Sequence, residues 1–463
     1  MKKSQVLNFI GVGEGMKNNF LKYLFIFVIV FLISFIYKVF IMPVTGDEIW
    51  VYGFSYNITK GLMLYRDFNV ILTPFYFFLS SLFIRIFGNY LISLHIFDCI
   101  LLGFLMIMVY KKLGLCKSLI FYVFELFNYF PTYSYFCLFL LFVIIYLLDE
   151  KKEISFSVIA FLCGLIFITK QSIGLFMIVP LLFYSKNKLR DLLVFIFPFV
   201  IVVIYLACHH ALFDFINYCF LGMFDFGESN LEFSIFFVFE LVLCSYLIYK
   251  LIRTKFLDKR ILFVLMFQIN IYPIFDIQHF LEVLIPVFYL FLDSCNICKL
   301  RFYYRFLLVA SLYVIFICYI VKCIIFLDYS ISLDKSSFLY LRNNSSSESY
   351  ILEKTRLLSE YIDDYDEYYF LFVNNYAIKL YNNMNIGKYD LLFDGNLGYH
   401  GDIRVIQEIN NNCKKKTCVF LVDKIKFKKY VQFSRKIYDY VLGNYNYIDE
   451  NDYFMVYDNQ KNT

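Results

Sequence analysis

Two adjacent carboxylates, Asp47 and Glu48, directly follow a long apolar segment, residues 21–42, and open a loop rich in aromatic residues. An apolar run of that length is sufficient to cross a bilayer as a helix. Side chains just beyond such a span lie at the level of the lipid headgroups, and a carboxylate held there can take a proton from an acceptor group. Asp47 and Glu48 therefore indicate chemistry at the membrane surface.

Other residues that can bind or transfer charge stand in loops or at the ends of apolar segments. They are Arg66, Asp67, His95, Lys170, Gln171, Asp276 and His279. Ionisable groups at span ends differ from those of a transporter, which lie near the bilayer midplane and often on broken helices of repeated halves. The sequence shows no such repeat. The distribution therefore favours a site at one membrane face.

The composition defines the elements that must position these residues. Hydrophobic residues make up 61% of the 463-residue chain and charged residues only 17%, with a mean hydropathy of +0.65. Soluble domains contain about 45–50% apolar residues, so we expect a polytopic helical membrane protein. The net charge of +5 is concentrated beside apolar segments, which argues against nucleic acid as a partner.

Apolar runs of helical length predict about eleven transmembrane helices. They fall near residues 21–42, 91–110, 118–130, 134–148, 154–169, 172–185, 190–208, 233–250, 261–275, 279–293 and 305–327. The apolar stretch 75–87 is short for a span, Pro74 precedes it and Arg85 interrupts it. We therefore predict an interfacial helix there, within a first external loop spanning residues 43–90.

Basic residues predict the orientation of the chain. Lysines and arginines recur at 2–22, 111–117, 151–152, 186–190, 250–260 and 299–305, whereas the alternate loops hold Lys60, Arg66, Arg85 and Lys170. Cytoplasmic loops carry an excess of Lys and Arg. The pattern predicts a multi-pass protein of the cell membrane with a cytoplasmic N-terminus and an external C-terminus.

The composition becomes polar after about residue 327. We expect a membrane domain at 1–327 and an extracytoplasmic α/β domain at 328–463, with helices near 350–361, 401–411 and 431–441 and strands near 369–373, 389–393, 418–422 and 453–457. Cys413 and Cys418 would pair if this side is oxidising. The domain could grip an acceptor or cover the active face, and the sequence does not choose between them.

A series of motifs in the membrane domain resembles a known family. They are Gly46-Asp47-Glu48, GLMLYRDF at 61–68, Pro74-Phe75-Tyr76, Phe87-Gly88, ITKQ at 168–171 and DIQH at 276–279. In their order along the chain and their shared membrane face, these motifs are similar to those of the GT-C glycosyltransferases. These polytopic enzymes use polyprenyl-phosphate-linked sugars and include protein mannosyltransferases and lipid A aminoarabinose transferases. The chain departs from them in having a single Pro74 after Thr73 and His95 where an arginine often opens the second span.

The resemblance implies that the first external loop holds the catalytic acid, that this loop contains interfacial helices, and that the donor is a lipid phosphate. Transfer to a hydroxyl or amine of a glycan, lipid or protein needs a base for the acceptor proton, and Asp47 suits this role. The leaving phosphate needs electrostatic stabilisation, for which we select Arg66, Lys170 and His279. A single displacement would invert the anomeric centre.

Alternatives remain for each group. Asp47 and Glu48 could cap a helix, and Glu48 could orient Asp47, bind an amine or help ligate a divalent ion. Lys170 could be a snorkelling anchor, and Asp276, His279 and Glu282 share one helix side and could bind a metal. Asp67, His95, Gln171 and Asp276 are supporting candidates. For the whole chain, a flippase or exporter of lipid-linked glycans and a non-catalytic scaffold are the competing functions.

Overall fold

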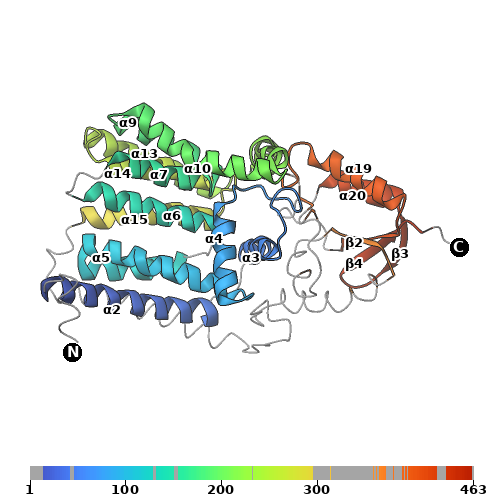
Figure 1. The fold of residues 1–463 in the computed structure, drawn as a ribbon, viewed down its shortest axis with the longest axis horizontal. Helices are drawn as coiled ribbons and strands as arrows, with labels where there is room; N and C mark the ends of the chain where they lie inside the picture. Colours follow the sequence, from blue (N-terminus) through green and yellow to red (C-terminus); the bar gives the residue numbers. More distant parts are fainter. Residues whose placement is uncertain are drawn as a thin grey trace.

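A computed structural model describes residues 14–41, 46–128, 132–150, 155–231, 233–295, 395–424 and 434–460, together with scattered positions between 313 and 393. Figure 1 shows a bundle of helices that run in one general direction, with a small domain of strands and helices at one of its ends. The predicted span 305–327 and the predicted helix 350–361 lie outside the described residues, apart from single positions.

Five helices of the bundle are long and apolar enough to cross a membrane. They are α2 (Glu14–Ile36, followed by the π-helical turn Tyr37–Ile41), α5 (Ile92–Asn128), α10 (Lys188–Cys208), α13 (Ile235–Arg253) and α15 (Ile277–Ser294). Many of their apolar side chains face outward, including Phe25 at 65% exposure and Ile252 at 61%. Large exposed apolar side chains on long helices are expected where lipid replaces water as the solvent.

Shorter helices complete the bundle. They are α6 (Tyr133–Asp149), α7 (Phe156–Phe167), α8 (Gln171–Phe176), α9 (Ile178–Tyr184) and α14 (Lys259–Phe267), which the 3-10 turn η3 (Gln268–Ile271) follows. Every span predicted up to residue 293 therefore has a helical counterpart. The chain is a multi-pass helical membrane protein, as its composition predicted.

The helix α5 consists of two helical pieces that meet at Gly114, where φ is 74° and ψ is 174°. Before this point Tyr110 contacts Tyr23 near the start of α2, and after it the Tyr122 hydroxyl lies 2.9 Å from Oγ of Ser34 near the end of α2. The chain thus returns along α2 after Gly114. Glycine adopts positive φ without a steric penalty, which permits this reversal between the predicted spans 91–110 and 118–130.

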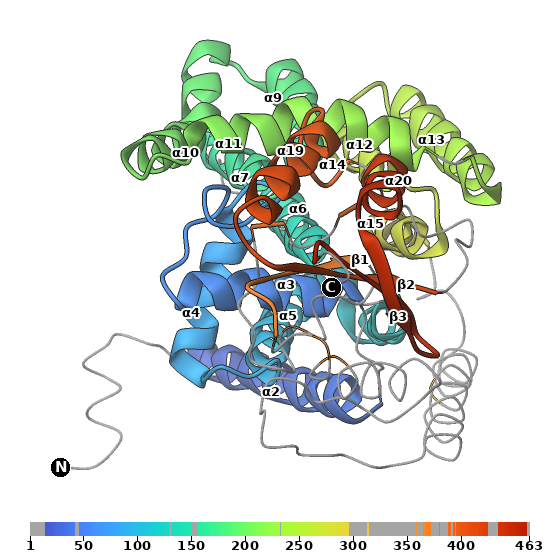
Figure 2. The ribbon, with the colours of Figure 1, turned by 90° about the vertical axis from the view of Figure 1, so that its right-hand side faces the viewer.

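Two helices of the first loop run across the end of the bundle rather than along it (Figures 1 and 2). They are α3 (Gly46–Thr59) and α4 (Phe75–Phe87), and α4 has the bounds predicted for the interfacial helix. Ser55 of α3 and Ser80 of α4 join their hydroxyls at 2.6 Å, and Phe54 packs edge-on against Phe77. We refer to this end as the α3 end and to the opposite one as the Gly114 end.

The C-terminal part contains a four-stranded sheet with the order β1-β2-β4-β3. The strands are β1 (Glu367–Leu371), β2 (Cys418–Asp423), β3 (Asn446–Glu450) and β4 (Phe454–Asp458); β1 and β2 are parallel and the other pairs are antiparallel. Residues of α19 (Gly401–Cys413) and α20 (Arg435–Asn444) cover one face, where Val405 and Ile437 pack with Phe420. The strand β3 was not predicted. Cys413 and Cys418 form a disulfide.

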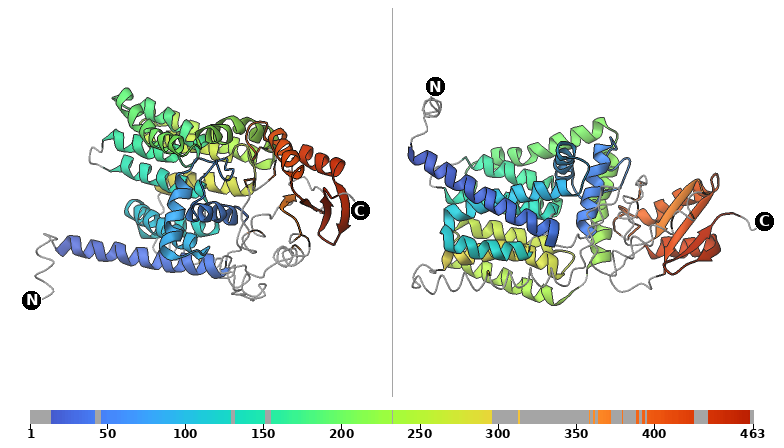
Figure 3. Two further views of the ribbon diagram at one scale, coloured as in Figure 1. Left: turned by 45° about the vertical axis from the view of Figure 1, so that its right-hand side comes forward. Right: turned by 90° about the horizontal axis from the view of Figure 1, so that it is seen from below.

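The sheet domain lies beyond the α3 end in both views of Figure 3. It rests on the segment between α10 and α13, which comprises α11 (Leu212–Ile216), the π-helical turn η2 (Asn217–Leu221) and α12 (Gly222–Asn230). The backbone N–H of Tyr399 donates to the Asn217 side chain at 2.8 Å, and that of His400 donates to Asp225 at 2.7 Å. The predicted strand 389–393 is described only in part. Gly395 and Gly398 lie in the turn that makes this contact with α12.

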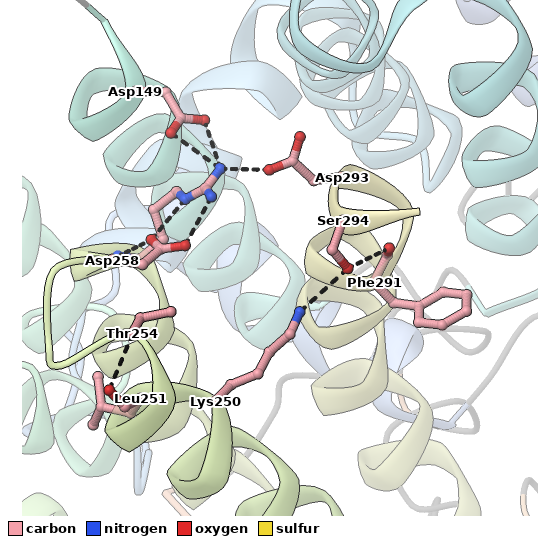
Figure 4. Close-up of polar contacts among 9 residues, drawn as sticks. Asp149, Lys250, Leu251, Thr254, Asp258, Phe291, Asp293 and Ser294 are labelled. Carbon is pink, nitrogen blue, oxygen red and sulfur yellow. Dashed lines mark hydrogen bonds and ion pairs between the residues drawn. The ribbon is translucent and has the colours of Figure 1, made fainter. Parts of the chain in front are cut away.

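A charged junction joins three helices at the Gly114 end (Figure 4). The guanidinium of Arg260 contacts Asp258 and Asp293 at 2.8 Å and Asp149 at 3.0 Å. These carboxylates belong to the end of α6, the start of α14 and the end of α15. The three carboxylates raise the pKa of Arg260 against the effect of burial, which lowers it, so the guanidinium remains charged and cross-links the helices.

Candidate functional site

Polar groups from five separate segments meet at the α3 end, around Asp47 in the first turn of α3. The carboxylate of Asp47 interacts electrostatically with His279, Asp276 and Lys170. His279 lies at the start of α15, and Lys170 lies between α7 and α8. The start of α6 and the turn η3 supply further contacts. We call Asp47, Lys170, Asp276 and His279, together with Ser134, Asn270 and Glu282, the Asp47 cluster.

Asp276 fixes His279 through the cap of α15. One oxygen of Asp276 accepts a hydrogen bond from the backbone N–H of His279 at 2.8 Å and lies 2.8 Å from Nδ1 of its imidazole. Aspartate is a preferred N-cap because its side chain satisfies a free N–H of the first turn. The same carboxylate therefore begins the helix and orients the imidazole, which leaves Nε2 for other contacts.

Lys170 is buried at the junction of α7 and α8. It occupies the N-cap position of α8 in extended conformation, and α8 folds back so closely that a Cβ at Gly174 would lie 2.1 Å from Cα of Phe167. The Lys170 ammonium donates to Oδ1 of Asn270 at 2.7 Å and to Ser134 at 3.2 Å. It also lies 5.3 Å from the centroid of the Tyr133 ring, a cation–π distance.

Asn270 links Lys170 to a further carboxylate. Its amide nitrogen donates to Oε2 of Glu282 at 2.8 Å, while its oxygen accepts from Lys170. Glu282 is 3% exposed and lies one turn beyond His279 on α15. The cluster thus contains two groups that can carry positive charge, Lys170 and His279, beside three carboxylates.

The surroundings shift the proton affinities of these groups. Although Asp47 remains accessible to solvent, the protein around it removes much of its hydration and raises its pKa above the usual range; the charges of His279 and Lys170 oppose this effect. Burial opposes ionisation of Asp276 too, but its hydrogen bonds with His279 hold its pKa below the usual value. Burial lowers the pKa of Lys170. Asp47 is therefore the more basic of the two aspartates.

Glu48 lies on a different face of α3 from Asp47. Its Oε1 is 2.6 Å from Nε2 of His95 on α5, and both side chains are buried. Asp98 on α5 and Lys38 at the end of α2 lie close enough to interact electrostatically with this pair. Asp47 and Glu48, although adjacent in the sequence, therefore lie in two separate environments.

The remaining candidates make other contacts. Arg66 forms a bidentate pair with Asp67, with two contacts of 2.8 Å, and its third nitrogen donates to the carbonyl of His209 at 3.4 Å. Gln171 donates to the carbonyls of Ile71 at 2.8 Å and of Cys219 at 2.9 Å, which ties the first loop to η2. Among the contacts of the described residues, none joins Arg66 or Asp67 to the Asp47 cluster.

Ser134 and Asn270 were not selected from the sequence as site residues, and Glu282 was considered there only as a possible metal ligand. Ser134 opens the predicted span 134–148, and Asn270 and Glu282 lie within the predicted spans 261–275 and 279–293. Polar side chains within membrane segments are costly and usually face the interior of the bundle. This cost is the signal by which the sequence could have indicated these residues, and it is strongest for Asn270.

The described residues include a cavity at the opposite end of the bundle, with a volume of about 650 Å³. Its lining includes Arg253, Lys259 and Arg260, but Arg260 is already paired with three carboxylates. No group of three or more His, Cys, Asp or Glu side chains suited to a metal ion occurs within the part of the chain described. The converging charges around Asp47 therefore define the candidate site.

The architecture defines a class: a polytopic helical membrane protein with a GT-C-like fold, helices lying across one end of the bundle and a small sheet domain beyond them. Among solved structures, the chain is similar to the crystal structure of ArnT from Cupriavidus metallidurans bound to undecaprenyl phosphate. The TM-score is 0.54 and the sequence identity 10%, over 96% of this chain and 98% of the ArnT chain. This likeness shows the fold. No family model and no curated protein sequence matches the chain.

Proposed function

We propose that the chain is a GT-C-type glycosyltransferase that moves a sugar from a polyprenyl-phosphate donor to a hydroxyl or amine of a glycan, lipid or protein acceptor. The observation that supports this most directly is the meeting of a basic carboxylate, Asp47, with the cationic groups Lys170 and His279. The fold adds support, since the ArnT structure that shares it holds undecaprenyl phosphate.

The cluster suits a single displacement. Asp47 takes the proton of the acceptor hydroxyl or amine as the acceptor attacks the anomeric carbon. The bond from that carbon to the phosphate oxygen breaks, and its electron pair remains on the phosphate. Lys170 and His279 stabilise the added negative charge, because electrostatic interactions strengthen where water is excluded. A single attack of this kind inverts the anomeric centre.

The role of Arg66 is a weaker part of the proposal. Its guanidinium is held by Asp67 and by the carbonyl of His209, so it would reach a phosphate only from the edge of the cluster. Asp67 would then hold Arg66, and Gln171 would hold the first loop. Asp276, His279 and Glu282 do not form a group suited to a metal ion, so no step of the proposed reaction is assigned to one.

The proposed location is the cell membrane, with the N-terminus cytoplasmic and the α3 end outside. The lysines and arginines beside Gly114, in contrast to the few at the α3 end, support this orientation. The Cys413–Cys418 disulfide supports it as well, because disulfides persist in oxidising compartments. Reporters fused after Lys112 and after His400 should lie on opposite sides of the membrane.

Genetic complementation tests the function. In cells from which the gene has been removed, the wild-type chain and Asp439→Asn, an exposed aspartate of the sheet domain, should restore the altered envelope glycan, whereas Asp47→Asn should not. General-base catalysis contributes about 10²–10⁴-fold in rate. Full restoration by Asp47→Asn at normal protein levels would contradict the assigned role of Asp47.

Binding of the lipid tests the cationic site separately. The purified full chain in nanodiscs should bind undecaprenyl phosphate, with Asp47→Asn binding like the wild type and Lys170→Met at least tenfold more weakly. Arg66→Ala should have the smaller effect. Equal affinity of the wild type and Lys170→Met would remove Lys170 from the phosphate site.

A further inference from the structure

The second carboxylate of the pair, Glu48, has a position that the proposed reaction does not use. Consecutive residues of an α-helix point about 100° apart. Asp47 is accessible and faces the cluster, whereas Glu48 is 2% exposed and faces the bundle. Direct contact of Glu48 with a substrate would require it to leave this buried position.

The partner of Glu48 belongs to the long helix beneath α3. His95 lies in the first turn of α5, is 6% exposed, and places Nε2 at 2.6 Å from Oε1 of Glu48. At the same level, Asp98 of α5 interacts electrostatically with Lys38 at the end of α2 and with His95. The pair therefore joins the first turn of α3 to the bundle through polar side chains that are removed from water.

A contact between two buried polar side chains constrains geometry strongly, because either partner left alone would be a buried polar group without its partner. The pair is within one residue of Asp47, so any shift of Glu48 relative to α5 would move the Asp47 carboxylate relative to Lys170 and His279. Displacement of about 1 Å can lower a catalysed rate by about 10²-fold.

We infer that Glu48 is a positioning residue, which through His95 fixes the first turn of α3 and so sets the carboxylate of Asp47 against Lys170 and His279. This inference rests on the proposed function for its kinetic consequence, but its structural content is independent of any reaction. It distinguishes Glu48 from a second base, an amine-binding group or a metal ligand.

Conservative variants separate positioning from direct chemistry. Glu48→Gln retains a polar oxygen at the contact with Nε2 of His95, and His95→Gln retains a polar side chain of similar reach. Each should keep kcat within about fivefold of the wild type, whereas Glu48→Ala and His95→Ala should lose about 10²-fold. The KM for the lipid donor and the affinity for undecaprenyl phosphate should change little in all four, because Lys170 is untouched.

Tyr122→Phe provides the matched control for general loosening of the bundle. It removes the buried contact between α5 and Ser34 of α2 without touching α3, and it should leave kcat unchanged. If Glu48→Gln were as inactive as Glu48→Ala in a folded protein, Glu48 would contact the substrate or a metal and the inference would be overturned. Wild-type kcat in His95→Ala would overturn it as well.

A chemical probe tests the structural content even if the proposed function fails. In the full chain with the exposed Cys208 replaced by serine, Asp47→Cys should react with a water-soluble methanethiosulfonate at a defined rate. His95→Ala should change that rate at least threefold, and His95→Gln and Tyr122→Phe should not. An unchanged rate in His95→Ala would show that the pair does not position α3.

Discussion

The side-chain oxygen of Asn270 accepts a hydrogen bond from the Lys170 ammonium at 2.7 Å. The amide nitrogen of the same residue donates to Glu282, so a neutral group separates the buried lysine from the buried carboxylate. An ammonium in a direct ion pair with Glu282 would be less available to a lipid phosphate. Asn270 thus binds the ammonium without neutralising its charge, as the proposed contact with phosphate requires.

Replacement of Asn270 should weaken binding of the lipid phosphate in a defined order. Asn270→Ala removes the acceptor of Lys170, a charge-assisted bond with a net value of about 1.5–3 kcal/mol. Asn270→Asp adds a carboxylate that neutralises Lys170 and repels phosphate, so its affinity for undecaprenyl phosphate should be the lowest. Titration calorimetry in nanodiscs measures the three affinities. Wild-type affinity in Asn270→Asp would contradict this account.

The pH dependence of transfer should follow Asp47. The base must be deprotonated, so kcat should fall as the pH drops through a pKa that lies above the usual aspartate value. Lys170→Met removes a charge that lowers this pKa, so the acid limb of its residual activity should move to higher pH. The control Lys60→Met, whose ammonium lies over Tyr56, should leave the limb in place. A downward shift in Lys170→Met would exclude Asp47 as the titrating base.

The junction at Arg260 should contribute to stability rather than to transfer. Arg260→Met leaves Asp149, Asp258 and Asp293 without their shared cation, and because the groups are partly exposed we expect a loss of about 2 kcal/mol. Arg253→Met should change stability little, since Arg253 is exposed and contacts Tyr249. Thermal unfolding in detergent checks both. Partial recovery in Arg260→Met combined with Asp149→Asn would confirm the electrostatic cause.

The contact between the sheet domain and α12 should depend on Gly398. Its φ is +79°, and a Cβ there would lie 2.6 Å from Oδ1 of Asn217 and 2.8 Å from the Tyr218 ring. Gly398→Val should separate the domain from α11 and α12, and faster hydrogen exchange in residues 212–230 would report this. Gly443→Ala, at a position with nothing within 4 Å, is the control. Unchanged exchange in Gly398→Val would contradict the docking role.

The sequence predicted those features that hydrophobicity and helical length determine. The interfacial helix Phe75–Phe87 was predicted with its observed bounds, because Pro74 precedes and Arg85 interrupts an apolar run too short to span. The two pieces of α5 were predicted as separate spans because lysines at 111–117 lie between two apolar runs. The strand β3 was missed, since its residues, Asn446–Glu450, are all exposed and show no buried face.

The site could be predicted only in part, because sequence spacing does not show which residues meet. Lys170 and His279 were selected for their charge and their position at span ends, and they do interact with Asp47. Ser134 and Asn270 are neutral, so their relevance depends on the packing of η3 against α6. The divergence of Asp47 and Glu48 required the orientation of α3, which its own sequence does not define.

At the seam between the bundle and the sheet domain, a Cβ on Gly222 would lie 2.7 Å from Cα of Gly398. Main chain meets main chain there, so no exchange of side chains can adjust the fit. Only coordinated changes in both segments would preserve this contact, and an insertion in either segment would displace the other. The two parts of the chain are therefore expected to have diversified in concert, with variation at this seam restricted to paired events.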